Sequence, residues 1–535
     1  MALPPPAPAA DPKPYRGAFG RAEAYHLLRR TTYAVTPARV DEAVALGLEA
    51  TLDRLLDAPD ELPAPVNASE PGDPHVGIGA TWIDAPLSET RELNGYRTNS
   101  LHAWIVRSAY RGDFSLRAKQ MMFWHNHFAC TQDGDARGYY DYFALLRRSA
   151  FGDFRRLIRD ITLDVTMLMF LDGAVNDAYS PNENYARELL ELYTLGKGPQ
   201  AGEGDYTTYT EDDVRALARA LTGWKVRYRG STRWGQRPES YFVARDHDDD
   251  AKQLSPRMSS VTIPGGGGAG EVDLVVDAIF RQPAVARHLV RKLYRWYVHY
   301  DVTDAVEREV VEPLARLFER SEFHVAPVLR QLLGSEHFFA LERRGAIVKN
   351  PLDYAIDLTA GLEYAPPADP LDEEFFMKRI ASLAEDQDML LWEPPQVAGF
   401  TPFYQAPLYN RAWITAQSLA VRGTQVETFT GGGYYHNDTV FRADLLAFFG
   451  RFPDATDPDA LVRRLAERVL PRPLSDAQLA ALKDILIPGL PDFEWTVEYG
   501  AYLADPGDPE VAQSVERKLR DLTRAVFAVA EAHLS

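Results

Sequence analysis

Two histidines form the first pattern in this chain that could support chemistry. His125 and His127 lie in the aromatic run Phe123-Trp124-His125-Asn126-His127-Phe128. Imidazoles two residues apart share a face on a strand but lie about 200° apart on a helix. The pair can therefore bind one metal ion from a strand, a loop or a helix end, but not from a helix interior. The alternative is that one imidazole faces a site while the other is a hydrogen-bonded core histidine.

A second polar set follows the spacing of a helix. Asn184, Glu188 and Glu191 occupy positions i, i+4 and i+7, so they line one helix face with Arg187 beside them. Two carboxylates one turn apart suit a divalent metal or an acid–base pair. A surface ladder of arginine and glutamate is the alternative. Apolar residues on the other sides of this helix disfavour the ladder, because the polar face would then point into a bundle.

A third polar set surrounds His247. Asp246, Asp248 and Asp250 flank this histidine, and Lys252 follows them. A histidine among carboxylates is a common neighbourhood of metal ions and of proton transfer. A solvated acidic loop is the alternative.

The charge and cysteine content narrow the classes of function. The chain of 535 residues has 58 basic and 77 acidic residues and a net charge of -19, which disfavours nucleic acid and anionic lipid as partners. A local basic patch can still attract such a partner despite the negative net charge. The stretch from Arg281 to Arg295 is locally basic, and we interpret it as a solvated or salt-bridged helix face. Cys130 is the sole cysteine, which excludes an internal disulfide and a cysteine zinc site. We expect Cys130 to be a small buried hydrophobe.

The hydropathy pattern predicts no membrane span, because no run approaches the roughly 18 apolar residues that a membrane helix needs. The first residues lack both the basic and the apolar regions of a signal peptide. We therefore expect a cytoplasmic protein from the sequence as given. A periplasmic or secreted protein remains the alternative if the true N-terminus differs.

Apolar residues recur mainly at helical spacing, which predicts a mainly α fold. The Pro- and Ala-rich residues 1–18 are expected to be disordered, and residues 19–535 to form a single large helical domain. Three stretches rich in Gly, Pro or Asp are expected to be irregular insertions, and they are residues 58–95, 225–270 and 385–435.

Two local signals are more specific. Val226-Arg227-Tyr228 and Tyr241-Phe242-Val243 are expected to be short strands of a small β-hairpin within the insertion 225–270. Thr210 is expected to cap a helix over residues 210–224, with Asp213 in the capping-box position.

The sequence resembles the family of domain of unknown function 1800 over roughly residues 20–530. The resemblance rests on several segments in the family's order: His26–Arg30, Phe123–Phe128, Pro181–Gly196, Tyr209–Val214, Ala218–Trp224, His247-Asp248 with Lys252, and Pro394–Phe400. The last segment carries Phe400 where the family usually has Trp. The resemblance implies a bacterial, largely helical protein of a family that is often secreted and often encoded beside a sulfatase-like family. It implies no established reaction.

The resemblance also sharpens the candidate site, because the family's polar signature falls on the same three segments. Packing alone would favour apolar residues at such positions. If the segments converge, their imidazoles and carboxylates suit Zn, Mn or Fe. The predicted metal ligands are His125, His127, Glu188, Glu191 and His247. The predicted catalytic residues are Glu188, Asp248 and Arg187, with Asp248 as an orienting group or base and Arg187 as a clamp. The predicted ligand-binding residues are Asn182, Asn184 and Lys252.

Two functions follow from these observations. The first is a metal-dependent enzyme, with a hydrolase favoured slightly over an oxidoreductase because nothing indicates an organic redox cofactor. The second is a non-catalytic helical scaffold, for example a partner of the sulfatase-like protein. In that case the polar signature is a buried hydrogen-bond network that fixes helix packing.

Overall fold

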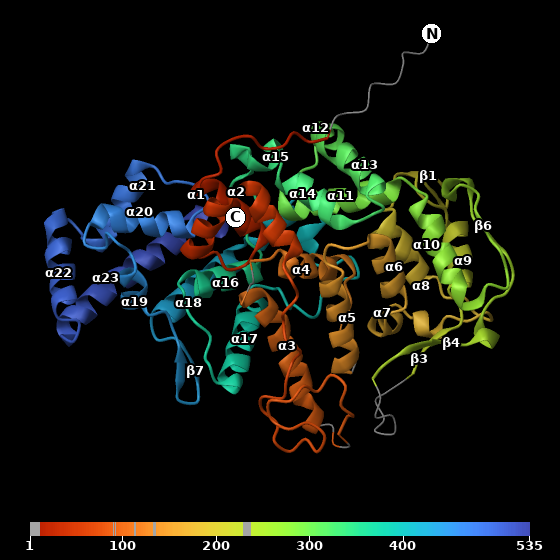
Figure 1. Ribbon diagram of the computed structural model, residues 1–535, viewed down its shortest axis with the longest axis horizontal. Helices are drawn as coiled ribbons and strands as arrows, with labels where there is room; N and C mark the ends of the chain where they lie inside the picture. Colours follow the sequence, from red (N-terminus) through yellow and green to blue (C-terminus); the bar gives the residue numbers. More distant parts are fainter. Residues whose placement is uncertain (1–10, 89, 91, 112–113, 132–134, 228–236) are drawn as a thin grey trace, which may run out of the picture.

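Helices build almost all of the molecule, and the strands form only small hairpins (Figure 1). The structure is a computed structural model that describes residues 11–88, 90, 92–111, 114–131, 135–227 and 237–535. The expected mainly α fold is confirmed. Among the described residues, no helix combines the length and the apolar character that crossing a membrane requires.

The helices of the first half surround the segments of chemical interest. They are α1 (Arg21–Thr31), α2 (Pro37–Asp57), α3 (Gly95–Tyr110), α4 (Arg117–His127), α5 (Ala136–Arg148), α6 (Phe154–Thr162), α7 (Val165–Phe170), α8 (Asn184–Glu188), a π-helix (Leu189–Thr194) and α9 (Glu211–Ala220). Thr210 caps α9 and forms the predicted capping box with Asp213, which confirms that expectation.

The helices of the second half begin beside α9 and end in a separate group. They are α10 (Glu271–Phe280), α11 (Ala284–Tyr297), α12 (Asp304–Val306), a second π-helix (Glu307–Val311), α13 (Glu312–Arg320), α14 (Val325–Leu333), α15 (Glu336–Phe339), α16 (Pro351–Gly361), α17 (Pro370–Glu385), α18 (Ala416–Thr430), α19 (Leu445–Gly450), α20 (Pro458–Val469), α21 (Asp476–Leu486), α22 (Asp492–Ala504) and α23 (Pro509–Ala528).

The strands pair as four antiparallel hairpins. They are β1 (Gln200–Gly202) with β2 (Asp205–Tyr206), β3 (Trp224–Val226) with β4 (Ser240–Phe242), β5 (Lys252–Gln253) with β6 (Thr262–Ile263), and β7 (Tyr434–His436) with β8 (Thr439–Phe441). The β3–β4 pair is the hairpin that the sequence predicts. Tyr228, at the end of its expected first strand, lies outside the described residues. The insertion 225–270 contains a second hairpin, β5–β6, that the sequence analysis did not anticipate.

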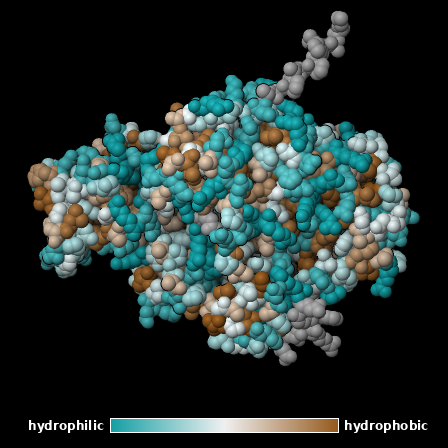
Figure 2. Space-filling view, in the orientation of Figure 1, coloured by the Kyte–Doolittle hydropathy of each residue, from teal (hydrophilic) through white to brown (hydrophobic). Residues whose placement is uncertain are grey.

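Two hydrophobic cores organise the helices. The larger core joins α1–α17, and the smaller core joins α18–α23 at one end of the molecule (Figure 1). Helix α16 contributes to both, because Ala355 and Ile356 lie in the larger core while Tyr354 and Leu358 lie in the smaller one. Hydrophilic residues cover most of the face shown in Figure 2.

Two of the expected irregular segments are more ordered than the sequence analysis predicted. The insertion 385–435 contains the regular helix α18, which Thr415 caps with its hydroxyl. Glycine and proline on both sides of α18 led to this wrong expectation. In the segment 1–18, residues 1–10 lie outside the described residues, and the backbones of Lys13 and Tyr15 hydrogen-bond to Glu336 and Gly334.

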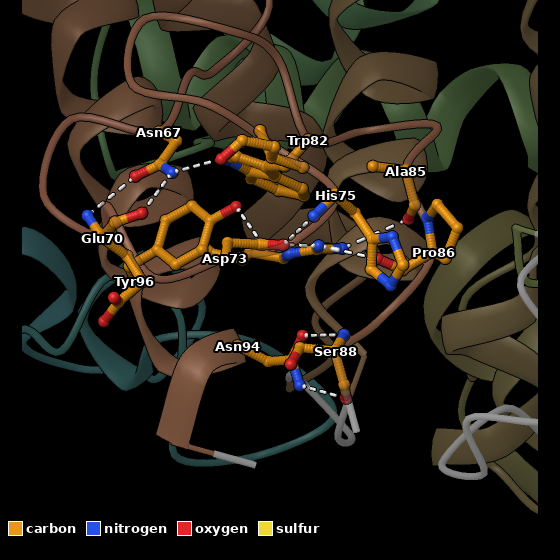
Figure 3. A network of polar contacts seen from close by, with 12 residues as sticks. Asn67, Glu70, Asp73, His75, Trp82, Ala85, Pro86, Ser88, Asn94 and Tyr96 are labelled. Atoms are coloured by element: carbon orange, nitrogen blue, oxygen red, sulfur yellow. Dashed lines mark hydrogen bonds and ion pairs between the residues drawn. The ribbon is translucent and has the colours of Figure 1, made fainter. Parts of the chain in front are cut away.

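The insertion 58–95 is irregular, as expected, and a buried polar network holds it (Figure 3). The carboxylate of Asp73 accepts hydrogen bonds from the Arg97 guanidinium and the Tyr96 hydroxyl, both at 2.9 Å. Arg97 is 1% exposed and also donates to the carbonyls of Ala85 and Pro86. The loop therefore uses side-chain bonds in place of regular secondary structure.

Asp73→Ala is expected to destabilise the protein by about 3–5 kcal/mol, because it leaves the buried Arg97 cation without its partner. Asp84→Ala is the matched control in the same loop. It breaks an ion pair with Arg237 in which the Asp84 side chain is 72% exposed, and such pairs contribute at most about 1 kcal/mol. Urea denaturation followed by tryptophan fluorescence measures both variants. Equal, small losses in the two variants would contradict a structural role for the Asp73–Arg97 pair.

Candidate functional site

A π-helical turn at Leu189–Thr194 lies at the centre of the candidate site. The sequence predicts a regular helix through this segment, but the helix widens after Glu188, and the amide groups of Leu195 and Gly196 both donate to the carbonyl of Leu190. π-Helical turns are rare and occur frequently at functional sites. Here the wider turn coincides with carbonyl groups that accept hydrogen bonds from side chains of other helices.

Side chains from α4 and α11 bind two of these carbonyls. His127 Nε2 donates to the Tyr193 carbonyl at 3.0 Å, and His288 Nε2 donates to the Leu192 carbonyl at 2.9 Å. Lys292 Nζ donates to the same Leu192 carbonyl at 3.1 Å and to His127 Nδ1 at 3.0 Å. Because a carbonyl only accepts, the hydrogen-bond pattern assigns the proton of each neutral imidazole to Nε2.

Lys292 differs from an ordinary lysine in its charge state. Burial, and to a smaller extent the nearby Arg295 cation, lowers its pKa from the usual 10.5 to about 7. In the described part of the chain, no carboxylate pairs with Lys292. A neutral amine has two N–H groups and one lone pair. Both hydrogens have acceptors at Leu192 and His127, so the lone pair is the group left for a ligand.

A small pocket adjoins this amine. Its volume of about 20 Å³ is enough for roughly one water molecule. Its wall is polar at Asn126, His127 and Lys292 and otherwise mainly aromatic, and the remaining lining residues are Phe123, Trp296, Ala398, Phe403 and Tyr404. The pocket thus joins one water-sized space to one amine and one imidazole.

Two glycines allow the surrounding segments to approach closely. Gly399 has φ +95°, and a Cβ there would lie 2.4 Å from the Asn126 carbonyl oxygen. Its neighbour Phe400 donates its backbone N–H to Asn126 Oδ1 at 2.9 Å. Gly196 has φ +74°, and a Cβ there would lie 2.5 Å from His288 Nδ1. Larger residues at either position would force apart the segments that form the pocket.

The other predicted histidine of α4, His125, is a core residue. It is fully buried, with Nδ1 3.0 Å from the Tyr142 hydroxyl and Nε2 2.8 Å from the Leu391 carbonyl. Burial lowers its pKa from 6.5 to about 4. The two histidines of α4 therefore have separate roles, which matches the alternative in which one is a hydrogen-bonded core histidine.

The predicted stripe on α8 and the π-helix is engaged in surface interactions. Arg187 forms two hydrogen bonds of 2.7 Å to Glu211 and one of 3.0 Å to Glu183. Glu191 accepts from the Tyr209 hydroxyl at 2.9 Å and pairs with Lys197. Arg187 is thus held by carboxylates of its own chain, which does not support its predicted role as a substrate clamp.

Glu188 and the asparagines lie beside this stripe. Burial and the neighbouring Glu191 carboxylate raise the pKa of Glu188. Asn182 Oδ1 accepts the backbone N–H of Asn184 at 2.9 Å, which closes a local turn at the start of α8. Neither His125 nor His127 hydrogen-bonds to Glu188 or Glu191 among the described contacts.

The third predicted segment forms a separate buried cluster. His247 donates from Nδ1 to the Thr222 carbonyl at 2.9 Å, and its Nε2 lies 3.2 Å from Glu271 Oε1. The fully buried Lys252 donates to Glu271 Oε2 at 2.6 Å. Asp248 accepts two hydrogen bonds from Arg219, at 2.6 and 3.1 Å. Lys252 and Asp248 are thus occupied by opposite charges of the chain itself.

The structure brings together only part of the predicted site. His127 meets the segment of Glu188 and Glu191 through the backbone of Tyr193, whereas His125 and His247 have other partners. Among the described residues, no group of three or more His, Cys, Asp or Glu side chains could hold a metal ion. The five predicted metal ligands therefore do not form one ligand set.

The sequence analysis missed Lys292 and His288. Both lie four residues apart on α11, inside the basic stretch that was interpreted as a solvated or salt-bridged face. That interpretation holds for Arg287 and Arg291, which pair with Glu312 and Glu307 at 2.6 and 2.5 Å. It is wrong for Lys292. The available signal was the spacing, since i and i+4 place these two residues on one face of the helix.

Comparison with known proteins identifies the family and nothing more specific. The family model described as "Protein of unknown function (DUF1800)" matches residues 26–492. The chain therefore belongs to this family. No curated protein and no solved structure matches the chain.

The buried histidines make the fold sensitive to acid. Burial lowers the pKa of His125 to about 4 and that of His288 to about 3, so the unfolded chain binds protons at pH values where the folded chain does not. The contribution of these neutral histidines to the free energy of unfolding is therefore fully present above about pH 6.5. It is lost as the pH decreases from 6.5 towards 4. Each such histidine contributes a slope of about 1.4 kcal/mol per pH unit.

His125→Gln is expected to reduce this slope by about one histidine's contribution, as measured by urea denaturation between pH 7 and pH 4. His324→Gln is the control, because His324 is exposed. An unchanged slope in His125→Gln would show that His125 is not held neutral in the folded protein.

Proposed function

We propose that this member of the DUF1800 family is an enzyme in which the amine of Lys292 acts as the general base of a hydrolysis. One observation carries this proposal: the amine lies at a pocket between two neutral acceptors, His127 Nδ1 and the Leu192 carbonyl, without a carboxylate partner among the described residues.

The arrangement is unfavourable for stability alone. The Lys292 side chain is half-buried, and a cation that loses part of its hydration without gaining an anion destabilises the fold. An apolar side chain of similar length would fill the same space without that cost. Strongly shifted pKa values without a structural need are typical of functional groups. A pKa of about 7 also places Lys292 where a general base works best at neutral pH.

The bonds of the site define the proton transfer. The Lys292 lone pair takes a proton from a water molecule, and the resulting hydroxide forms a bond to the electrophilic atom of an ester. The bond from that atom to the leaving oxygen then breaks, and the Lys292 ammonium returns the proton to this oxygen, which departs as an alcohol. The ammonium that forms keeps its two hydrogen bonds to His127 Nδ1 and Leu192 and directs its third N–H at the pocket. His127 maintains the geometry, because its Nε2 proton is bound by the Tyr193 carbonyl and its Nδ1 must then accept.

The proposed reaction routes no step through a metal. The sequence analysis expected Zn, Mn or Fe on His125, His127, Glu188, Glu191 and His247, and these residues lie with different partners. A divalent metal and an oxidoreductase reaction stay predictions of the sequence alone.

A non-catalytic scaffold is the second candidate, and the other polar clusters favour it. His125 and the Lys252–Glu271 pair are buried and bonded within the chain, as expected for networks that fix helix packing. A sulfatase-like partner belongs to this second candidate as a proposal. The two candidate functions predict different effects of replacing Lys292 on the stability of the protein.

Lys292→Met separates the two candidates through stability. If the amine is functional, its removal is expected to stabilise the protein by roughly 1–3 kcal/mol at pH 7, since the loss of two hydrogen bonds offsets part of the gain. The lowered pKa destabilises the folded state fully below about pH 7, and this effect disappears as the pH rises towards 10.5. The variant should lose that pH dependence in urea denaturation.

Lys252→Met is the matched control for this experiment. It removes the partner of the fully buried Glu271 and is expected to destabilise the protein by about 3–5 kcal/mol. If Lys292→Met destabilises the protein as strongly as Lys252→Met, the amine has a structural role and the scaffold becomes the better interpretation.

Activity and reactivity complete the test. On a panel of carboxylic, phosphate and sulfate esters and lactones, Lys292→Met is expected to reduce any hydrolysis by about 10²–10⁴-fold. Reductive methylation with formaldehyde, followed by mass spectrometry, should show a midpoint near pH 7 for Lys292. Lys483 is the control, because hydrogen bonds to Asp459 and Asp492 raise its pKa. Equal midpoints for the two lysines would refute the proposal.

A further inference from the structure

A larger pocket lies between the first helix and the C-terminal helices, away from any residue discussed so far. Its volume is about 320 Å³, which is at the lower end of the range for small-molecule sites. Residues of α1 form one wall, and residues of α20 and of the segment leading to α21 form the other. The labels of α1, α20 and α21 lie near one another in Figure 1. The lining contains five arginines: Arg21, Arg29, Arg344, Arg463 and Arg472.

The arginines of this pocket outnumber the carboxylates around them. Glu467 is the sole acidic residue of the lining. Behind it, Arg344 pairs with Glu23 at 2.6 Å, and Arg21 pairs with Asp41. The five guanidinium groups thus have three carboxylates in the lining and its ion pairs, and Asp357, which also attracts Arg29, is paired with Lys349. This leaves an excess of two positive charges in a concave surface. This concentration occurs in a chain with a net charge of -19.

Two of the arginines are fixed by neutral groups. Arg29 donates to the carbonyls of Glu467 and Arg468 at 3.2 and 3.0 Å and stacks on the Tyr25 ring at 4.7 Å. Arg472 donates to the carbonyls of Arg344 and Leu341. Carbonyl groups orient a guanidinium but do not neutralise it, so both charges remain available to an anion.

Arg463 is the most accessible of the five. It is exposed on α20, and it makes no hydrogen bond or ion pair with any residue that the structure describes. Its neighbour Arg464 pairs with Asp454 at 2.7 Å and does not line the pocket. Of these two adjacent residues of α20, Arg464 is therefore engaged in an ion pair, whereas Arg463 has no such partner among the described residues.

The rest of the pocket is apolar. Tyr25, Leu470, Pro471, Pro473, Leu474 and Leu479 line it together with two alanines. A ligand that satisfies both parts of this lining has an anionic head for the guanidinium groups and a compact apolar body for the other wall.

We infer that this pocket binds a small organic anion, with a carboxylate, phosphate or sulfate group held by Arg463, Arg472 and Arg29. The two walls belong to different hydrophobic cores, since Leu28 of α1 lies in the larger core and Leu465 of α20 in the smaller one. An anion that contacts both walls stabilises their contact by mass action, because it binds only when the walls are together.

Isothermal titration calorimetry on the full chain tests the inference with phenyl phosphate, phenyl sulfate and phenylacetate as probes. Wild-type protein is expected to bind at least one of the three saturably at millimolar concentrations or below, and the strongest of them identifies the head group. Inorganic phosphate should bind more weakly than phenyl phosphate, because it leaves the apolar wall without contact.

Arg463→Gln is expected to weaken binding of the strongest probe by about tenfold or more, and Arg464→Gln to leave it within about twofold. Both residues are exposed on α20, so neither substitution threatens the fold. Absence of saturable binding for all three probes would overturn the inference. An equal loss in the two variants would also overturn it, because binding would then follow surface charge and not the pocket. None of these measurements depends on the proposed activity of Lys292.

Discussion

The carbonyl groups of the π-helical turn Leu189–Thr194 determine how the centre of the molecule is built. Two of them, at Leu192 and Tyr193, accept hydrogen bonds from His127, His288 and Lys292. Regular α-helical pairing uses each carbonyl within its own helix, so it offers few acceptors to neighbouring helices. The turn therefore binds α4 and α11 to one point and determines which nitrogen of each imidazole carries the proton. Without these acceptors, His127 and Lys292 would keep only the hydrogen bond between them, and His288 Nε2 would lose its hydrogen bond to Leu192.

The half-buried Lys292 differs from three charged groups of the chain that are paired with an opposite charge. Arg97 pairs with Asp73, Lys252 with Glu271, and Asp248 with Arg219. In each pair the opposite charge compensates for the hydration that is lost on folding. Lys292 has only neutral acceptors, as do the buried Arg29 and Arg422. An arginine keeps its charge in such surroundings, whereas the pKa of the Lys292 amine falls to about 7. Paired charges are expected where a network fixes the packing of helices, because the pair keeps its charge at every physiological pH. A group that gains and loses a proton near pH 7 suits chemistry better than packing.

The sequence predicts those features that depend on neighbouring residues. The capping box of Thr210 and Asp213, the hairpin around Val226 and Tyr241, and the mainly helical fold all follow from local patterns. The face shared by Asn184, Glu188 and Glu191 was derived from a period of 3.6 residues, and this period ends where the π-turn begins. A π-turn depends on tertiary partners for its carbonyls, and those partners lie about a hundred residues away along the chain, at His288 and Lys292. The role of Lys292 was hidden for the same reason, because its basic neighbours on α11 are surface residues.

Charge illustrates the same distinction between local and global information. A net charge of -19 argues against polyanionic partners such as nucleic acid, whose field extends over the whole surface. It does not determine the potential inside a concave site, because screening limits interactions between exposed charges to about 8–10 Å. The five arginines of the pocket between α1 and α20 come from parts of the chain more than four hundred residues apart, such as Arg21 and Arg472. Their proximity is created by the contact between the two hydrophobic cores, so an anion-binding surface arises in an acidic protein only once both cores have formed.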